Sequence, residues 1–288
     1  MMLSIVALAV SSSLAMSVPS ASVGVVDVAT DGKTKINLAG RQRMLSQRMA
    51  KAACLSSIGT HGEEFLGELQ HAYDDFEKAL AGLQHGDETL GMLKETDERI
   101  LGSLSDVEVF WEPYKASISA ILTASGGEKD FSQLPEQAMA VLRGAHRAVG
   151  VIESVYATGG DVSPVRARTI NVAGRQRMLS QKAAKEYCFI MAGIEPEKHR
   201  AALEETIGQF DQALINLRGG TDGLETPTGA AERQLETVQG IWDRLRPRME
   251  AALHGVELDK QELGIVAAQS NRLLSDMNRV VYIYSVLQ

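Results

Sequence analysis

The sequence predicts an all-α protein made of two tandem four-helix up-down bundles related by a pseudo-two-fold axis. Three observations predict this fold: a repeated segment, long amphipathic runs rich in Leu, Ala and Met, and short breaks that contain Gly or Pro. No alternation of apolar and polar residues is long enough for a strand that matters. The length of 288 residues suits one large domain or two of ordinary size.

An internal repeat organises the chain. Residues 36–54 read INLAGRQRMLSQRMAKAAC, and residues 170–188 read INVAGRQRMLSQKAAKEYC. The second stretch lies 134 residues after the first without a gap, and both contain the nine residues AGRQRMLSQ. Later matches are weaker but keep their order. Such a repeat predicts equivalent structural units, and we assign the first copy to residues 30–160 and the second to residues 161–288.

Each copy is predicted to form four helices joined by short loops. In the first copy the predicted helices are 33–58, 61–85, 90–123 and 133–158. In the second copy they are 164–193, 196–218, 226–253 and 258–287. Between the copies, the segment 158–164 is expected to be a short connection or only a kink between two long helices.

The N-terminus has the composition of a secretory signal peptide. Its apolar run, from Leu3 to Val10, is too short to span a bilayer and precedes small residues, although no Lys or Arg comes before it. We expect residues 1–22 to be the signal peptide, with cleavage between Ala15 and Gly24. No later segment has about 18 consecutive apolar residues. A periplasmic protein without a transmembrane helix in the mature chain is therefore expected.

One face of the first helix is identical in the two copies. Residues three and four apart share a helical face. The identical pairs are Ile36 and Ile170, Gly40 and Gly174, Arg43 and Arg177, Gln47 and Gln181, Ala50 and Ala184, and Cys54 and Cys188. A purely structural core would tolerate apolar exchange along such a face. We therefore expect the two first helices to contact each other across the pseudo-two-fold axis, with Arg43 opposite Arg177.

Two facing guanidiniums repel each other, and burying them unpaired is unfavourable. A planar oxyanion between them, such as nitrate, nitrite or a carboxylate, would resolve both problems because a guanidinium offers a matching fork of donors. The alternative for a helical arginine is a solvated or salt-bridged side chain. The residues predicted to bind the ligand are Arg43, Arg177, Gly40, Gly174, Gln47, Gln181, Arg41 and Arg175.

Cys54 and Cys188 are the only cysteines, and they occupy equivalent positions. If the two first helices run parallel, both cysteines lie at the same height, and a disulfide can form where their Cα atoms lie within about 7 Å. The alternative is a pair of small buried residues.

The repeated residues resemble the periplasmic sensor domain shared by nitrate- and nitrite-sensing histidine kinases of the NarX type and type IV pilus chemoreceptors of the PilJ type. The motif N-x-A-G-x-x-R-M-x-S-x-R of that family is matched from Asn37 to Arg48 and again from Asn171, with Lys182 in place of the last Arg. In the nitrate sensors, the Arg before Met comes from both subunits of a homodimer and grips one nitrate. The resemblance implies that Arg43 and Arg177 do so within one chain. Family members usually carry transmembrane helices and signalling modules, which we do not expect in the mature chain. The expected alternatives are a signal passed to a separate membrane partner, such as a sensor kinase or chemoreceptor, or ligand binding alone.

Other chemistry is not indicated. The net charge of −8 does not favour nucleic acid. Glu68 and His71 resemble half of a di-metal pattern whose second half is missing. We expect no enzyme, cofactor or metal.

The predicted function is a periplasmic sensor of a small oxyanion, with nitrate and nitrite as first candidates. The alternative is a non-catalytic protein-interaction adaptor of a chemoreceptor, histidine kinase or type IV pilus system, in which the same face docks a partner helix or forms a homodimer.

Overall fold

The computed structural model describes residues 28–58, 61–255 and 259–287. Within these ranges the chain forms eight α-helices and no strand, so the all-α prediction is confirmed. The helices of the first copy are α1 (Val28–Ile58), α2 (Gly62–His85), α3 (Glu98–Leu122) and α4 (Glu128–Thr158), with a 3-10 turn η1 (Glu88–Leu90) after α2. Those of the second copy are α5 (Pro164–Met191), α6 (Pro196–Gly219), α7 (Ala230–Leu253) and α8 (Lys260–Tyr282), followed by a π-helical turn η2 (Ile283–Leu287).

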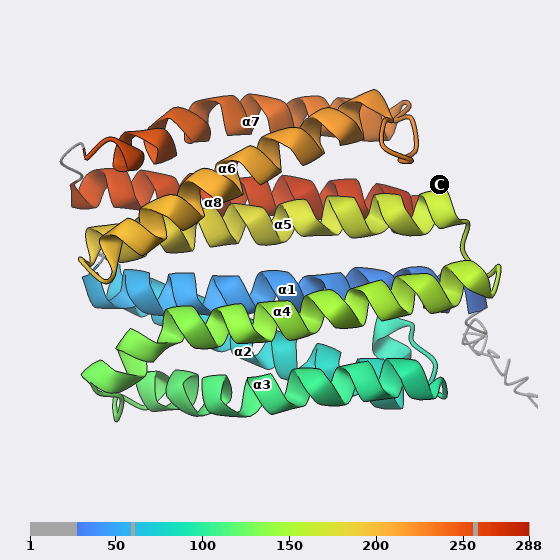
Figure 1. Cartoon of the computed structure of the whole chain (residues 1–288), viewed down its shortest axis with the longest axis horizontal. Helices are drawn as coiled ribbons and strands as arrows, with labels where there is room; N and C mark the ends of the chain where they lie inside the picture. Colours follow the sequence, from blue (N-terminus) through green and yellow to red (C-terminus); the bar gives the residue numbers. More distant parts are fainter. Residues whose placement is uncertain (1–27, 59–60, 256–258, 288) are drawn as a thin grey trace, which may run out of the picture.

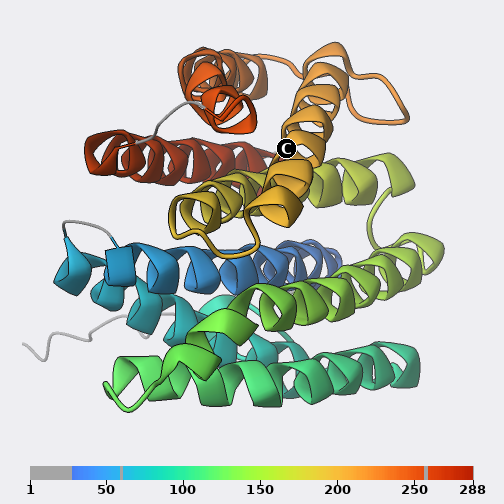
Figure 2. The same ribbon diagram turned by 60° about the vertical axis from the view of Figure 1, so that its left-hand side comes forward.

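The eight helices divide into two halves that meet at α1 and α5. Figure 1 shows α1 to α4 in the lower half and α5 to α8 in the upper half, and the same division holds in the turned view of Figure 2. The first helix of each half contacts its own neighbours: α1 contacts α2 and α4, and α5 contacts α6 and α8. These two helices also contact each other over much of their length. The central contact of the molecule is therefore between the two repeated segments.

Four predicted helix starts are wrong by four residues or more. Helix α1 begins at Val28 rather than residue 33 and α4 at Glu128 rather than residue 133, and local caps place the other two later than predicted. Helix α3 begins at Glu98 rather than residue 90, since the carboxylate of Asp97 accepts hydrogen bonds from the backbone N–H groups of Arg99 and Ile100. Helix α7 begins at Ala230 rather than residue 226, because the preceding Gly229 has a φ of 53°, outside the helical region. In both cases the side chain or backbone of one residue sets the boundary.

The connection between the copies reverses the chain direction. Helix α4 ends at Thr158 and α5 begins at Pro164, where the hydroxyl of Ser163 accepts a hydrogen bond from the N–H of Arg166. Figure 1 shows α5 returning alongside α4, so the segment is a turn rather than a kink. Because α4 also runs opposite to α1, this reversal makes α1 and α5 parallel.

Helices α1 and α5 are buried on almost every side, although they carry many polar side chains. In α1 the buried polar group includes Gln42, Arg43, Gln47 and Lys51. In α5 every residue from 176 to 190 is buried. Buried polar groups need partners inside the protein, so the contacts between these two helices determine the candidate site.

The repeat extends to the outer core. In the first copy the rings of Phe76 and Trp111 stack with centroids 4.2 Å apart, and in the second copy those of Phe210 and Trp242 stack at 4.1 Å. Each indole N–H donates to a carboxylate on the same helix as its phenylalanine. Equivalent aromatic layers therefore hold α3 on α2 and α7 on α6.

Cys54 and Cys188 are joined by a disulfide, with their Cα atoms 6.2 Å apart. The bond links the C-terminal parts of the parallel helices α1 and α5, and so fixes the two halves of the molecule to each other. The predicted signal peptide lies outside the described residues. Among the helices of the described ranges, none has the length and apolar character needed to cross a membrane.

Replacing both cysteines by serine is expected to lower the free energy of unfolding by about 2–4 kcal/mol. The physical reason is that the bond joins residues 134 positions apart and so restricts the unfolded chain. Denaturant unfolding of the Cys54→Ser/Cys188→Ser chain against the oxidised parent measures the difference. Dithiothreitol should lower the parent's midpoint only; an equal response of both proteins would contradict the expectation.

Candidate functional site

Arg43 and Arg177 lie together at the contact between α1 and α5. A Cβ atom at Gly40 would lie 3.3 Å from Nη2 of Arg43 and 3.5 Å from Nη2 of Arg177. At Gly174 the same atoms would lie at 3.6 Å and 3.2 Å. Both guanidiniums therefore lie against both glycines, and the absence of side chains at these two positions provides their space.

Each guanidinium crosses to the opposite helix. Nη2 of Arg43 donates to the backbone oxygen of Asn171 at 3.2 Å, and Nη2 of Arg177 donates to the backbone oxygen of Asn37 at 3.1 Å. The two bonds are equivalent, since Asn37 and Asn171 occupy the same position of the repeat. Such reciprocal contacts are those of an isologous dimer interface, here formed within one chain.

The second terminal nitrogen of each guanidinium faces the last helix of its own copy. Nη1 of Arg43 lies 3.4 Å from Nδ1 of His146 on α4, and Nη1 of Arg177 donates to Oδ1 of Asn278 on α8 at 3.3 Å. The sequence did not reveal either partner. His146 follows Arg43 by 103 residues, whereas Asn278 follows Arg177 by 101 residues. The spacing between equivalent residues of α4 and α8 is therefore two residues shorter than the 134 residues between equivalent residues of α1 and α5, so an alignment of the two copies without a gap does not pair His146 with Asn278.

The two arginines are buried without a carboxylate partner. Arg43 is 1% exposed and Arg177 is 3% exposed. Within the described ranges, neither forms an ion pair with Asp or Glu, and the Nε atom of each has no hydrogen-bond partner. Burial, with a smaller effect of Arg175, lowers the pKa of Arg43 to about 10. Burial, followed by repulsion from Arg43, lowers the pKa of Arg177 to about 9. Burial is the main cause of both shifts, and the carboxylate of Glu153 opposes the lowering of the pKa of Arg43 only in part.

Arg41 and Arg175 contact the second helices instead of each other. The guanidinium of Arg41 forms an ion pair with Asp75 at 2.5 Å, and Nη2 of Arg175 donates to Oε1 of Gln209 at 2.9 Å. Both remain beside open clefts that reach the buried pair. Arg41 and Arg177 line a cleft of about 490 Å³ next to α8, whereas Arg175 and Arg43 line one of about 340 Å³ on the other side. A small ligand can approach the arginines from either side.

A comparison with known families matches the same repeated segments. Residues 26–134 and 165–262 match the family described as "Type IV pili methyl-accepting chemotaxis transducer N-term", also called PilJ. The chain belongs to this family. The match covers most of the sequence and begins again in the second copy, so the resemblance inferred from the repeated motif is confirmed.

A curated relative points to the same class of protein. The chain is 32% identical over 126 residues to the methyl-accepting chemotaxis protein McpN of Pseudomonas aeruginosa. The matched region is 42% of this chain and 22% of the relative. The match of this PilJ-family chain therefore covers about a fifth of the length of that relative.

The glutamines of this PilJ-family chain use their amide donors on backbone oxygens. Nε2 of Gln47 donates to the carbonyl of Ala138 at 3.0 Å, and Nε2 of Gln181 donates to that of Ser270 at 3.1 Å. The bonds hold α1 to α4 and α5 to α8. A ligand could receive hydrogen bonds from these glutamines only if the bonds to the carbonyls opened.

Sequence reasoning missed a buried ion cluster one turn beyond the glutamines. Nζ of Lys51 lies 2.7 Å from Oε1 of Glu68, 2.7 Å from Oε1 of Gln181 and 2.5 Å from Oδ1 of Asn271. Burial lowers the pKa of Lys51 to about 8. Burial opposes ionisation of Glu68, but Lys51 and Arg48 lower its pKa to about 2. The carboxylate thus neutralises cations of α1 rather than pairing with His71. In the described ranges no three His, Cys, Asp or Glu side chains gather as metal ligands.

Filling the space at Gly40 is expected to destabilise the fold. Leucine at this position would press on both guanidiniums, so Gly40→Leu should lower the free energy of unfolding by about 1–3 kcal/mol. The matched control is Gly67→Leu on α2, where a Cβ atom meets nothing within 4 Å and helix propensity favours leucine. Chemical denaturation compares the two. Equal effects at both glycines would mean that the close approach has no energetic importance.

The Glu68 carboxylate is expected to make stability depend on acid pH. Its pKa in the folded state, about 2, lies below the ordinary value of 4.5, so its contribution is present above pH 4.5 and disappears as the pH falls toward 2. Glu68→Gln should therefore be less stable than the parent at neutral pH, with a difference that shrinks across this window. The exposed Glu63→Gln on the same helix is the control. A difference independent of pH would argue against the ion cluster.

Proposed function

We propose that this chain is a periplasmic, non-catalytic sensor in which a small planar oxyanion, nitrate or nitrite, binds between Arg43 and Arg177. The observation that carries the proposal is the pair of guanidiniums, 1% and 3% exposed, without a carboxylate partner in the part of the chain that the structure describes. An anion supplies the counter-charge that the protein does not. The resemblance to nitrate-sensing domains selects the planar oxyanions among the small anions.

The arginines keep donors for such a ligand. A guanidinium has five N–H groups. In each arginine, Nη1 faces a single group on α4 or α8, Nη2 donates to one asparagine carbonyl, and Nε has no partner. An anion on the pseudo-two-fold axis would accept from both side chains at once, with bonds strengthened by charge. It would also favour the charged forms, whose pKa values burial lowers.

The location of the site gives a route from binding to signalling. Arg43 belongs to one half of the molecule and Arg177 to the other, and α1 and α5 contact each other along their length. A ligand shifts the balance between two arrangements only if it binds one of them more tightly. An anion held by both arginines favours arrangements in which the halves approach closely at Gly40 and Gly174.

Export and a membrane partner complete the proposal. Residues 1–22 would direct secretion, the disulfide suits an oxidising compartment, and the two units would correspond to residues 30–160 and 161–288. The family is described as the N-terminal part of a methyl-accepting chemotaxis transducer, and the relative as a methyl-accepting chemotaxis protein. We therefore propose that the signal passes to a separate chemoreceptor or sensor kinase.

The adaptor interpretation requires a free first-helix face. In the structure that face is occupied within the chain, since α1 and α5 cover each other and share a disulfide. A partner helix or a second copy would have to displace this contact. The geometry therefore supports ligand binding over docking.

Isothermal titration calorimetry with nitrate, nitrite, sulfate and acetate tests the proposal. One nitrate or nitrite should bind per chain, and Arg43→Met and Arg177→Met should each weaken binding by roughly ten- to a hundredfold, the value of a charged hydrogen bond. The matched control is the exposed Arg272→Met on α8. Without anions, Arg177→Met should unfold at or above the parent's temperature, because it removes a buried unpaired charge.

Two results would overturn the proposed site. One is the absence of anion binding by the parent; the other is unchanged binding by both arginine variants. A concentration-dependent dimer of the parent that Gly40→Leu abolishes would favour the adaptor instead.

A further inference from the structure

The two copies differ at the buried lysine that follows the shared glutamine. In the first copy Lys51 contacts three oxygens, one of which belongs to Glu68 on α2. The equivalent lysine of the second copy is Lys185, but the position equivalent to Glu68 is Ala202 on α6. Lys51 also contacts Asn271 on α8, and the residue of α4 at the equivalent position is Met139, which has no oxygen in its side chain. Two of the three oxygen acceptors of the lysine are therefore missing, and the counterpart of the third, Oε1 of Gln47, has no hydrogen-bond partner in the described ranges.

Lys185 is left with a single oxygen. Its ammonium group lies 3.0 Å from Oε1 of Glu186, the neighbouring residue of α5, and its side chain is 1% exposed. An ammonium group has three N–H donors, so two of them lack an acceptor among the described residues. The same Glu186 oxygen also lies 3.4 Å from Nζ of Lys182, and the other oxygen contacts Nδ1 of His199. One carboxylate thus serves three basic side chains.

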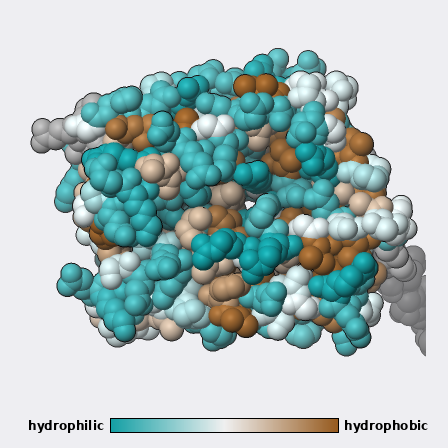
Figure 3. All heavy atoms as spheres, viewed as in Figure 1, coloured by the Kyte–Doolittle hydropathy of each residue, from teal (hydrophilic) through white to brown (hydrophobic). Residues whose placement is uncertain are grey.

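A cavity occupies the place of the missing glutamate. It lies between α4, α5 and α6 and has a volume of about 600 Å³. Figure 3 shows the face that it opens on, which is hollowed between the two halves near the centre of the view, with apolar and hydrophilic side chains at the rim. Basic residues outnumber the three glutamates of the lining, Glu136, Glu186 and Glu205, and Met139, Leu142 and Met178 form an apolar wall beside Ala202.

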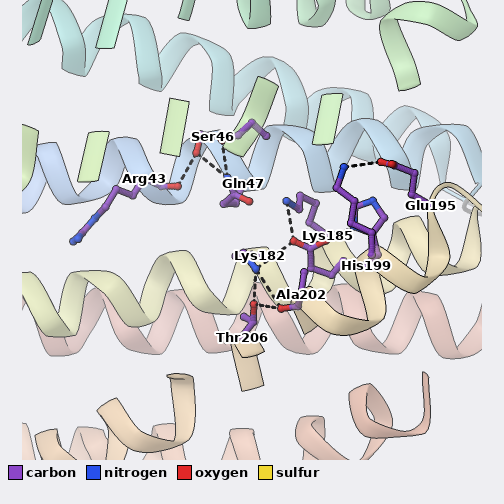
Figure 4. Close-up of polar contacts among 12 residues, drawn as sticks. Arg43, Ser46, Gln47, Lys182, Lys185, Glu195, His199, Ala202 and Thr206 are labelled. Atoms are coloured by element: carbon purple, nitrogen blue, oxygen red, sulfur yellow. Dashed lines mark hydrogen bonds and ion pairs between the residues drawn. The ribbon is translucent and has the colours of Figure 1, made fainter. Parts of the chain in front are cut away.

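The polar groups at the basic end converge without filling their bonding capacity. Figure 4 shows Lys182 reaching Ala202 and Thr206, while Lys185 and His199 lie at the same end, several turns from Arg43. His199 is 3% exposed, lines the cavity, and its Nε2 atom has no hydrogen-bond partner in the described ranges. Burial opposes ionisation of Glu186, but Lys185 and the hydrogen bond from His199 lower its pKa to about 2. The carboxylate is therefore ionised and already shared.

We propose that this cavity binds a small organic acid, whose carboxylate takes the place that the Glu68 carboxylate has in the first copy. The carboxylate contacts Lys185 and Lys182, and the apolar part lies against Met139, Leu142 and Met178. Nitrate alone would leave most of a cavity of about 600 Å³ empty, whereas an apolar wall beside a basic end suits a carboxylate with a short hydrocarbon chain. This second site belongs to the second copy only and does not depend on an anion at Arg43 and Arg177.

Calorimetry with hexanoate and its uncharged analogue hexanamide tests the proposal. Hexanoate should bind once per chain, and hexanamide at least roughly tenfold more weakly, because it lacks the charge that the lysines require. Ala202→Glu should rebuild the arrangement of the first copy, weaken hexanoate binding at least roughly tenfold and raise the melting temperature. The matched control is Ala201→Glu, which adds the same charge at an exposed neighbouring position and should retain binding.

Nitrate titration of the same variant separates the two sites. Ala202→Glu should retain the nitrate binding of the parent while it loses hexanoate. Absence of hexanoate binding by the parent, equal binding of hexanamide, or unchanged hexanoate binding by Ala202→Glu would overturn the second site, whatever nitrate does.

Glu68→Ala provides an independent test should Ala202→Glu fail to fold. The variant removes the carboxylate from the first copy, so it should melt at a lower temperature than the parent. Acetate, which supplies the deleted atoms, should raise the melting temperature of Glu68→Ala more than that of Glu63→Ala. Equal responses of the two variants to acetate would show that a free carboxylate does not enter such a position, which would overturn the proposal.

Discussion

The contact of α1 with α5 brings two cations together in the centre of the protein, and the other features of the structure depend on this constraint. Parallel helices from the two repeats place Arg43 and Arg177 at the same height. Gly40 and Gly174 provide the space for the guanidiniums. The disulfide joins the same two helices further along. A fold that holds two like charges together must supply opposite charge, or leave a place for a ligand that does.

Along the contact between α1 and α5, the cations of successive helical turns obtain opposite charge in different ways. Outside the centre, Arg41 is neutralised by Asp75 on α2. One turn beyond the glutamines, Lys51 is neutralised by Glu68, also on α2. In the described ranges neither central arginine forms an ion pair with a carboxylate, and Arg175, the counterpart of Arg41, donates to Gln209 instead. The central arginines differ from Arg175 in being almost fully buried, and this burial without an ion pair is the basis of the proposed ligand site.

Duplication within one chain permits the two halves to differ, which a homodimer cannot do. The central arginines have equivalent contacts in both copies, as expected for a site on the pseudo-two-fold axis. Away from the axis the copies diverge: Glu68 fills the space beside Lys51, whereas Ala202 leaves a cavity beside Lys185. An asymmetric molecule can thus combine one shared site with a second site in a single half.

The sequence by itself determined the helical class, the repeat and the face on which Arg43 and Arg177 lie, because helical periodicity and the match between the copies are local properties of the chain. Only the tertiary structure decided what these arginines contact. Their partners His146 and Asn278 lie more than a hundred residues away on helices shifted by two positions, and no local pattern records that shift. The cavity beside Ala202 likewise depends on which side chains α4 and α6 bring to α5. The alanine indicates a missing carboxylate only because the tertiary structure places it beside Lys185.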